Sequence, residues 1–154
     1  MRAVIQRVSE ANVSVEGETT GAIGIGLVVL VGVATEDTER DAVTLATKLV
    51  GLRIFPDDDR KMNRSIVDAG GSMLLISQFT LLADLRKGRR PAFNGAAPSE
   101  IAEPLLATLA AAIEAEGIEV EQGRFGAMMD VSLTNDGPVT IMLDSADRNR
   151  PRRG

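Results

Sequence analysis

Apolar and polar positions alternate near the start of the chain, as in a strand with one buried face. Within residues 2–15, Ala11, Val13 and Val15 are separated by single polar residues, which is the side-chain period of a β-strand. Residues 16–18 suit a turn, and a second strand is expected to return after it. The pattern therefore predicts an N-terminal hairpin.

Two other stretches are continuously apolar, which is typical of strands covered on both faces. The first is residues 26–33, rich in valine and leucine, and the second is residues 72–76. Both are expected to be central strands of a sheet. Three further strands are predicted at about residues 118–123, 128–134 and 139–143.

Helical spacing marks two segments between the strands. Val43, Ala46 and Leu49 fall on one helical face, and Gly51 is placed to end that helix. The second helix is expected to begin at Pro104, since proline fits the first helical position, and to end at Gly117. Its apolar stripe consists of Ile101, Leu105, Leu106, Leu109 and Ile113.

Hairpins mixed with crossover helices predict an α+β fold with a mixed sheet and two main helices, not a doubly wound one. The predicted domain spans residues 1–145, and the basic residues 146–154 are expected to be a disordered tail. Residues 135–140, which contain Asn135, Gly137 and Pro138, lie between two predicted strands. They are interpreted as a hairpin turn.

Composition narrows the chemistry that this chain can perform. Its 154 residues contain no cysteine and no histidine, which excludes disulfides, thiolate nucleophiles, imidazole bases and zinc sites built from those ligands. The net charge is −5, so the overall charge does not indicate a nucleic-acid partner. The longest apolar run, Leu27–Val31, is far shorter than the ~20 residues that span a bilayer. A cytoplasmic protein without signal peptide is expected.

Two motifs are interpreted as structural. The glycine spacing of residues 21–26 is the reverse of the dinucleotide fingerprint and precedes a strand, so it predicts an irregular strand junction and no cofactor. Residues 57–59 are three aspartates, but Arg60 and Lys61 occupy places where an EF-hand needs ligands and glycine. A solvated acidic turn and no metal site are expected there.

Two neighbouring segments are candidates for function. Ser77, Gln78, Phe79 and Thr80 follow the buried strand at 72–76, and strand ends with polar side chains are common places for sites. A dense basic segment, Lys87-Gly88-Arg89-Arg90-Pro91, comes shortly after. Composition alone favours a strand-end turn for the first segment and, by a small margin, polyanion binding for the second.

Several motifs together resemble the D-aminoacyl-tRNA deacylase family over residues 1 to about 145. The matching segments are Met1-Arg2-Ala3-Val4-Ile5-Gln6-Arg7-Val8, Lys61-Met62-Asn63, Ser77-Gln78-Phe79-Thr80-Leu81, Lys87-Gly88-Arg89-Arg90-Pro91, Gly123 with Phe125-Gly126-Ala127, and Asn135-Asp136-Gly137-Pro138-Val139-Thr140. Leu82 and Leu85 depart from the family pattern in the loop after the third segment. The resemblance implies a compact domain with a barrel-like sheet.

The resemblance also implies an activity and the residues that perform it. Family members are homodimers that hydrolyse D-aminoacyl esters of tRNA, clear glycine from alanine tRNA and spare L-aminoacyl esters. Carried over, Ser77, Gln78, Phe79 and Thr80 form the catalytic pocket. Gly137 and Pro138, joined by a cis peptide, reach in from the partner subunit as the chiral filter, and Met129 contributes to substrate binding. Lys87, Arg89 and Arg90 are expected to contact the tRNA acceptor end.

Alternative functions remain open at this point. An editing hydrolase for a mischarged L-amino acid has the same architecture, but the Gly137-Pro138 pair favours D-specificity. A noncatalytic RNA-binding module is the other alternative. Such modules usually stack bases on aromatic side chains, and this chain has few of them, with no Trp, no Tyr and four Phe.

Because no base lies near Thr80 in the sequence, the 2′-hydroxyl of the tRNA is expected to assist water attack.

Overall fold

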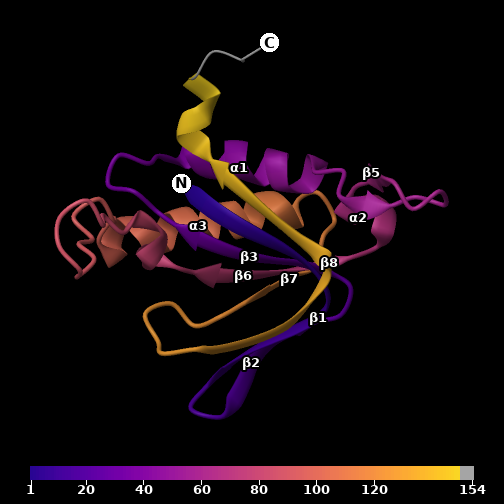
Figure 1. Cartoon of the computed structure of the whole chain (residues 1–154), viewed down its shortest axis with the longest axis horizontal. Helices are drawn as coiled ribbons and strands as arrows, with labels where there is room; N and C mark the ends of the chain where they lie inside the picture. Colours follow the sequence, from indigo (N-terminus) through magenta and orange to yellow (C-terminus); the bar gives the residue numbers. More distant parts are fainter. Residues whose placement is uncertain (150–154) are drawn as a thin grey trace.

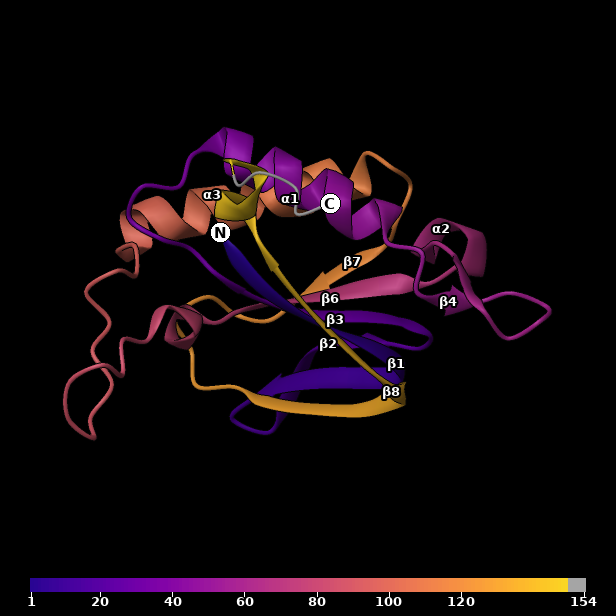
Figure 2. The same ribbon diagram turned by 45° about the horizontal axis from the view of Figure 1, so that its top comes forward.

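The computed structural model describes residues 1–149 and consists of a strongly curved sheet with helices on one face (Figure 1). The two long helices, α1 (Glu39–Gly51) and α3 (Ser99–Glu114), lie side by side on that face. Figure 2 shows the sheet curling beneath them. The predicted α+β class with two main helices is confirmed.

Strand β1 (Arg2–Val15) organises the sheet because it pairs along both edges. On one edge its first half pairs with β3 (Gly26–Gly32) and its second half with β2 (Glu18–Ile23). On the other edge it pairs with β8 (Asp130–Asp144). Glu16 and Gly17 have φ angles of 51° and 82°, the left-handed pair that a two-residue hairpin turn requires. The predicted hairpin is confirmed.

The remaining strands are parallel and carry the sheet toward closure. Strand β6 (Ser72–Ser77) pairs with β3, and β7 (Val120–Gln122) pairs with β6. A Cβ on Gly21 of β2 would lie 3.0 Å from the backbone oxygen of Gln122 in β7, so the two ends of the sheet nearly meet. The sheet is therefore mixed and barrel-like, as expected.

Helix α1 buries a face centred one position earlier than predicted. Ala42, Leu45, Ala46 and Leu49 are buried, whereas Val43 is 49% exposed. Alanine and valine can each lie on a buried or an exposed face of a helix. The sequence pattern alone therefore did not show which face of α1 is buried. Thr38 caps the helix through a capping box with Asp41.

The predicted start of the second helix at Pro104 is wrong, because α3 begins at Ser99 and includes that proline. Ile101 N and Ala102 N both donate to the carbonyl of Pro98, which closes the first turn before the proline is reached. Pro104 lies on the exposed side of the helix, where water can solvate the carbonyl that its missing N–H leaves without a partner.

The hairpin predicted at residues 135–140 is also wrong. Residues on both sides of this segment belong to β8 and pair with the same edge of β1, with partners Val8↔Asn135 and Gln6↔Thr140. One residue of β1 therefore faces four of β8, and residues 136–139 bulge out where the strand bends (Figure 1). Pairing partners are invisible in the pattern of a single strand, so the turn residues suggested a reversal.

Shorter elements complete the fold: β4 (Phe55–Pro56), β5 (Met62–Arg64), α2 (Ile66–Ala69), and the 3-10 helices η1 (Phe79–Leu82) and η2 (Ser145–Asn149). The aspartate run 57–59 lies in the β4–β5 turn. There the Asp57 carboxylate accepts bonds from Asn63 Nδ2, Asp59 N and Lys61 N at 2.6–2.9 Å. The bond from Asn63 is the main cause that lowers its pKa. Residues 150–154 of the predicted tail lie outside the described residues.

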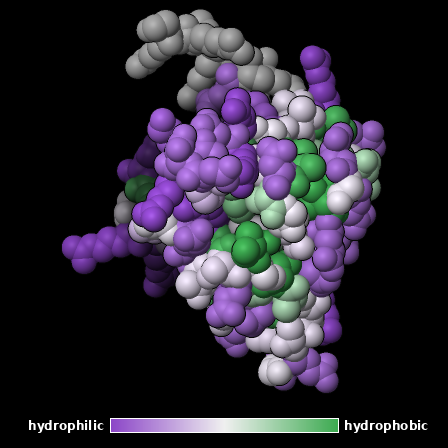
Figure 3. Space-filling model, turned by 90° about the vertical axis from the view of Figure 1, so that its right-hand side faces the viewer, coloured by the Kyte–Doolittle hydropathy of each residue, from purple (hydrophilic) through white to green (hydrophobic). Residues whose placement is uncertain are grey.

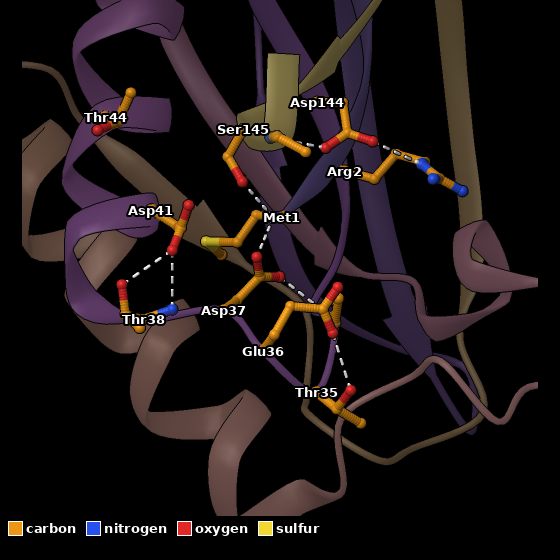
Figure 4. A network of polar contacts seen from close by, with 12 residues as sticks. Met1, Arg2, Thr35, Glu36, Asp37, Thr38, Asp41, Thr44, Asp144 and Ser145 are labelled. Atoms are coloured by element: carbon orange, nitrogen blue, oxygen red, sulfur yellow. Dashed lines mark hydrogen bonds and ion pairs between the residues drawn. The ribbon is translucent and has the colours of Figure 1, made fainter. Parts of the chain in front are cut away.

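A polar network joins the start of β1, the segment before α1 and the end of β8 (Figure 4). The α-amino group of Met1 lies 2.5 Å from both Asp37 Oδ1 and Ser145 Oγ, and Ala34 N donates to Asp37 Oδ2 at 2.6 Å. These contacts hold the segment that follows β3. No helix within residues 1–149 is both long and apolar enough to cross a membrane.

Candidate active site

A cavity of about 550 Å³ opens at the carboxyl end of β6, between η1, the start of α3 and the β7–β8 loop. A neighbouring cavity of about 430 Å³ shares Ser77, Leu106 and Phe125 with it and continues along α3. All side chains that line the larger cavity are uncharged: Val31, Val33, Ser77, Gln78, Phe79, Thr80, Ala97, Ser99, Ala102, Leu106, Phe125, Gly126, Ala127, Met128 and Met129.

The four catalytic candidates form one wall of this cavity because β6 ends there. Gln78 N donates to Val31 O at 2.7 Å, which extends the parallel pairing of β3 and β6 by one bond. The chain then turns into η1, where Leu81 N donates to Gln78 O at 3.2 Å. The backbone N–H groups of Phe79 and Thr80 come before the first hydrogen bond of this turn, so the turn itself gives them no acceptor.

Thr80 receives a hydrogen bond, and no charged side chain within residues 1–149 lines the larger cavity beside it. Gln78 Nε2 donates to Thr80 Oγ1, and the lining side chains are uncharged. Within residues 1–149, the polar groups that line the larger cavity are hydroxyls, one amide and the backbone. Such groups can orient a substrate and stabilise developing negative charge. Glu103, Glu114 and Arg124 line the neighbouring cavity.

The opposite wall is the β7–β8 loop. Gly123 N donates to Leu75 O at 3.1 Å, which anchors the loop to β6. A Cβ on Gly123 would lie 2.5 Å from Met129 Sδ, so the absence of a side chain there lets Met129 pack against the loop. Met128 and Met129 both line the cavity, and Met128 is 92% exposed.

Sequence reasoning did not single out the α3 wall of the cavity. Ala102 and Leu106 line the cavity, and Ala97 and Ser99 lie just before them. Leu106 belongs to the apolar stripe of the second predicted helix. The spacing of a helix stripe cannot separate a side chain facing a cavity from one facing the core. Phe125, Gly126 and Ala127 had been noted only as a matching motif.

Gly137 and Pro138 are joined by a cis peptide bond, as expected, but they are not among the residues that line this cavity. They lie in the bulge at the bend of β8, on the opposite side of the molecule from the segment 83–97 (Figure 1). Within one chain the structure therefore does not bring Gly137-Pro138 together with Ser77–Thr80.

The bulge is held by Arg7, a residue that sequence reasoning did not assign to the site. The side chain of Arg7 is buried in β1, where Nε donates to Asp136 O at 3.0 Å and Nη1 donates to Ile54 O at 2.6 Å. Nε also lies 3.3 Å from Asp136 Oδ2. Across the base of the bulge, Val139 N donates to Asn135 Oδ1 at 2.8 Å. The sequence could have indicated that Arg7 is buried. In the alternation of β1 it lies on the same face as the buried Ala3 and Ile5.

The basic segment forms an exposed loop near the mouth of the cavity. Asp84 and Ala92 exchange two backbone bonds of 2.7 and 3.0 Å that close the loop. Hydrogen bonds from Arg86 lower the pKa of Asp84 to about 2, so these two charges offset each other. Lys87, Arg89 and Arg90 form no ion pair with any other residue in the part of the chain that the structure describes.

Comparison with known proteins identifies close relatives of this chain. The family model described as D-Tyr-tRNA(Tyr) deacylase matches residues 4–144. A D-aminoacyl-tRNA deacylase of Roseiflexus castenholzii is 59% identical over 152 residues, covering 99% of this chain and 97% of that protein. One from Thermus aquaticus is 58% identical, covering 96% of this chain and 97% of its own.

Two solved structures share the fold of this chain. A structure titled c-Myc DNA Unwinding Element Binding Protein superposes with a TM-score of 0.87 at 39% identity, covering 94% of this chain and 98% of that one. A probable eukaryotic D-amino acid tRNA deacylase, at 16% identity, shares the fold with a TM-score of 0.79 over 92% of this chain and 97% of that one. The family model spans nearly all of the sheet and both cavity walls, and this chain belongs to the D-Tyr-tRNA(Tyr) deacylase family.

Proposed function

We propose that this chain hydrolyses the ester bond between a D-amino acid and the terminal adenosine of tRNA. It would release the free amino acid and the tRNA, and it would also clear glycine mischarged onto alanine tRNA. The observation that carries the proposal is the uncharged cavity between Ser77–Thr80 and Phe125–Met129, in a chain 59% identical to a D-aminoacyl-tRNA deacylase. Its work on tRNA would take place in the cytoplasm.

The protein would act as a homodimer in which Gly137 and Pro138 of one subunit reach the cavity of the other. Two observations support this arrangement. The pair lies away from its own cavity, and β8 leaves one edge unpaired with Val131, Leu133 and Met142 between 37% and 68% exposed. Figure 3, which views the side where β8 bends, shows apolar side chains gathered among polar ones. Such exposed apolar patches favour a protein partner.

Chiral selection would follow from the shape of this composite site. Backbone carbonyls of Gly137 and Pro138 would hold the α-ammonium of the substrate and leave no volume where an L side chain points. A D side chain points away from them, and glycine has no side chain to exclude. Discrimination would therefore come from a built-in clash with the wrong substrate.

The chemical step would need little from protein side chains. Water would attack the ester carbonyl, assisted by the neighbouring 2′-hydroxyl of the ribose, and the bond to the 3′-oxygen would break as that oxygen takes up a proton. The backbone N–H groups of Phe79 and Thr80 would stabilise the oxyanion, a role worth about 3–4 kcal/mol per well-placed donor. No metal or cofactor would take part.

Thr80→Ala tests whether a side chain performs the chemistry. We expect this variant to retain kcat for D-tyrosyl-tRNA within about tenfold of wild type, because the backbone N–H of residue 80 remains. The measurement is steady-state deacylation at saturating D-tyrosyl-tRNA, with circular dichroism to confirm folding. Ser77→Ala provides a matched hydroxyl deletion in the same wall. Loss of turnover in a folded Thr80→Ala variant that still binds tRNA would make the hydroxyl the catalytic group.

The activity itself is tested by deacylation of D-tyrosyl-tRNA and L-tyrosyl-tRNA in parallel, with excess chelator. Loss of the D ester alone is the expected result. Loss of both esters would contradict the chiral filter and favour an editing hydrolase for L-amino acids. Loss of neither, from a folded dimer, would favour the noncatalytic RNA-binding module. A fall in rate on adding chelator would contradict metal independence.

The basic loop is expected to contact phosphates of the acceptor end. Replacing Lys87, Arg89 and Arg90 together by alanine should raise the Kd for tRNA and flatten its salt dependence. The slope of log K against log salt should fall by about 2, since each lost phosphate contact removes roughly 0.7–0.9. Lys61→Ala, on the β4–β5 turn, serves as the control cation. An unchanged slope would show that tRNA passes elsewhere.

A further inference from the structure

Two of the four phenylalanines meet at the mouth of the cavity. The rings of Phe79 and Phe93 pack edge to face, with centroids 4.9 Å apart and planes at 71°. Phe79 is 57% exposed although it lines the cavity. In an edge-to-face pair each ring is held in one orientation, so a flat apolar surface is presented to solvent at the place where a bound substrate must leave the cavity.

The loop that ends beside these rings carries positive charge that no ion pair within residues 1–149 offsets. Phe93 directly follows Ala92, whose bonds to Asp84 close the basic loop. The rings therefore lie at the base of that loop, and Lys87, Arg89 and Arg90 lie toward its tip. Figure 2 shows the segment 83–97 projecting from the body of the molecule beyond the sheet. Rings that can stack beside cations without ion-pair partners are the features of a groove for single-stranded nucleic acid.

We propose that the nucleotide preceding the terminal adenosine stacks its base on the exposed face of Phe79, while the phosphates on either side lie against the basic loop. Phe93 is the positioning residue that holds the Phe79 ring. The proposal rests on the proposed function, which puts the terminal adenosine in the cavity and leaves the next nucleotide at its mouth. Because every base has a flat face, this subsite accepts a nucleotide without reading its identity.

Substrates of graded length isolate this subsite. The probes are D-tyrosyl-adenosine, the D-tyrosyl ester of the dinucleotide cytidylyl-adenosine, and the same dinucleotide ester without the cytosine base. We expect wild-type kcat/KM to be about tenfold higher for the full dinucleotide than for the abasic one, mainly through KM. The phosphate alone should account for the remaining advantage over D-tyrosyl-adenosine.

Variants at Phe79 and Phe93 test whether the rings cause the higher kcat/KM for the full dinucleotide ester. Phe93→Leu, outside the cavity lining, should reduce the dinucleotide advantage about tenfold with a much smaller effect on D-tyrosyl-adenosine. Phe79→Leu should reduce the same advantage about tenfold, measured relative to its own rate on D-tyrosyl-adenosine, because Phe79 also forms part of the cavity wall. Phe93→Tyr should preserve it, because the ring pair is retained. Leu85→Ala is the matched control, since this apolar side chain on the same loop is 66% exposed and lies outside the ring pair.

The outcomes separate the proposal from its alternatives. Equal losses on all three probes would overturn it, since they would show that the rings only shape the cavity. An advantage that survives both leucine variants would also overturn it. If Phe79→Leu instead dissociates a dimer in sedimentation, a second copy of this chain covers the ring and the subsite is wrong. Wild-type protein that hydrolyses none of the probes or D-tyrosyl-tRNA would refute the proposed function itself.

Discussion

Replacing Arg7 by alanine is expected to lower the preference for D-tyrosyl-tRNA over L-tyrosyl-tRNA by at least about tenfold. Arg7 is not among the residues that line the cavity, but its side chain donates to the carbonyls of Asp136 and Ile54. Asp136 directly precedes the Gly137-Pro138 pair that we propose as the chiral filter. Without the guanidinium, the bulge loses the group that fixes how far this pair projects.

Stability should fall in the same variant. Arg7 is 8% exposed, so its removal takes the donors from the buried bond to Ile54 O and the partly buried bond to Asp136 O, and it opens a void beneath the bulge. Such losses are worth about 2–4 kcal/mol of unfolding free energy. Thermal unfolding would measure this cost, and deacylation of both esters at a temperature well below the midpoint would measure the preference separately.

Two further variants distinguish the directed hydrogen bonds of the Arg7 guanidinium from its positive charge. Arg7→Lys keeps the charge, but a single ammonium cannot reproduce the two directed bonds of a guanidinium, so an intermediate preference is expected. Arg64→Ala removes an arginine from an exposed pair with Asp58 and should change neither the preference nor the stability by more than about 1 kcal/mol. An Arg7→Ala variant with wild-type preference would contradict the role assigned to the bulge.

Local patterns predicted those parts of the fold that local physics decides. The hairpin of β1 and β2 followed from alternation and a turn with glycine, and the buried strands followed from continuous apolar runs. The polar residues directly after the buried strand favoured a strand-end turn, and the chain turns into η1 there. Each of these inferences depends on residues close together in the chain, which is why they were confirmed.

The errors concern features that distant residues decide. Residues 135–140 contain ordinary turn residues, but β1 pairs with both flanking segments, and that pairing converts the turn into a bulge. Pro104 is tolerated because α3 places it on the exposed side of its second turn. Ala102 faces the cavity only because α3 packs across the end of β6. The local sequence does not indicate any of these tertiary contacts.

For Arg7, one feature could be predicted from the local sequence and another depends on distant residues. Its place in the alternation of β1 puts it on the buried side with Ala3 and Ile5, and a charged residue there needs specific partners. The sequence could therefore have marked Arg7 as structurally committed. Its partners, the carbonyls of Ile54 and Asp136, come from segments far along the chain and could not have been named.

Gly32→Ala is expected to reduce kcat/KM for D-tyrosyl-tRNA by about 100-fold. Gly32 ends β3 directly beneath η1, and a Cβ at this position would lie 2.9 Å from Gln78 O and 2.4 Å from Leu82 Cδ2. Leu82 can move because it is a side chain, but Gln78 O belongs to the backbone that places the N–H groups of Phe79 and Thr80. The methyl group would push η1 away from β3, and a displacement near 1 Å can cost about this much activity.

The double variant Gly32→Ala/Leu82→Ala distinguishes this effect from simple unfolding. It removes the clash with Leu82 but retains the one with Gln78 O. Relieved overpacking should therefore recover stability without recovering activity. Gly51→Ala is the matched control, because a Cβ there meets nothing within 4 Å at the end of α1, and alanine favours a helix. If Gly32→Ala keeps wild-type kcat/KM with D-tyrosyl-tRNA, the backbone of η1 cannot be the oxyanion-stabilising group, and the catalytic role would pass to the side chains of Gln78 or Thr80.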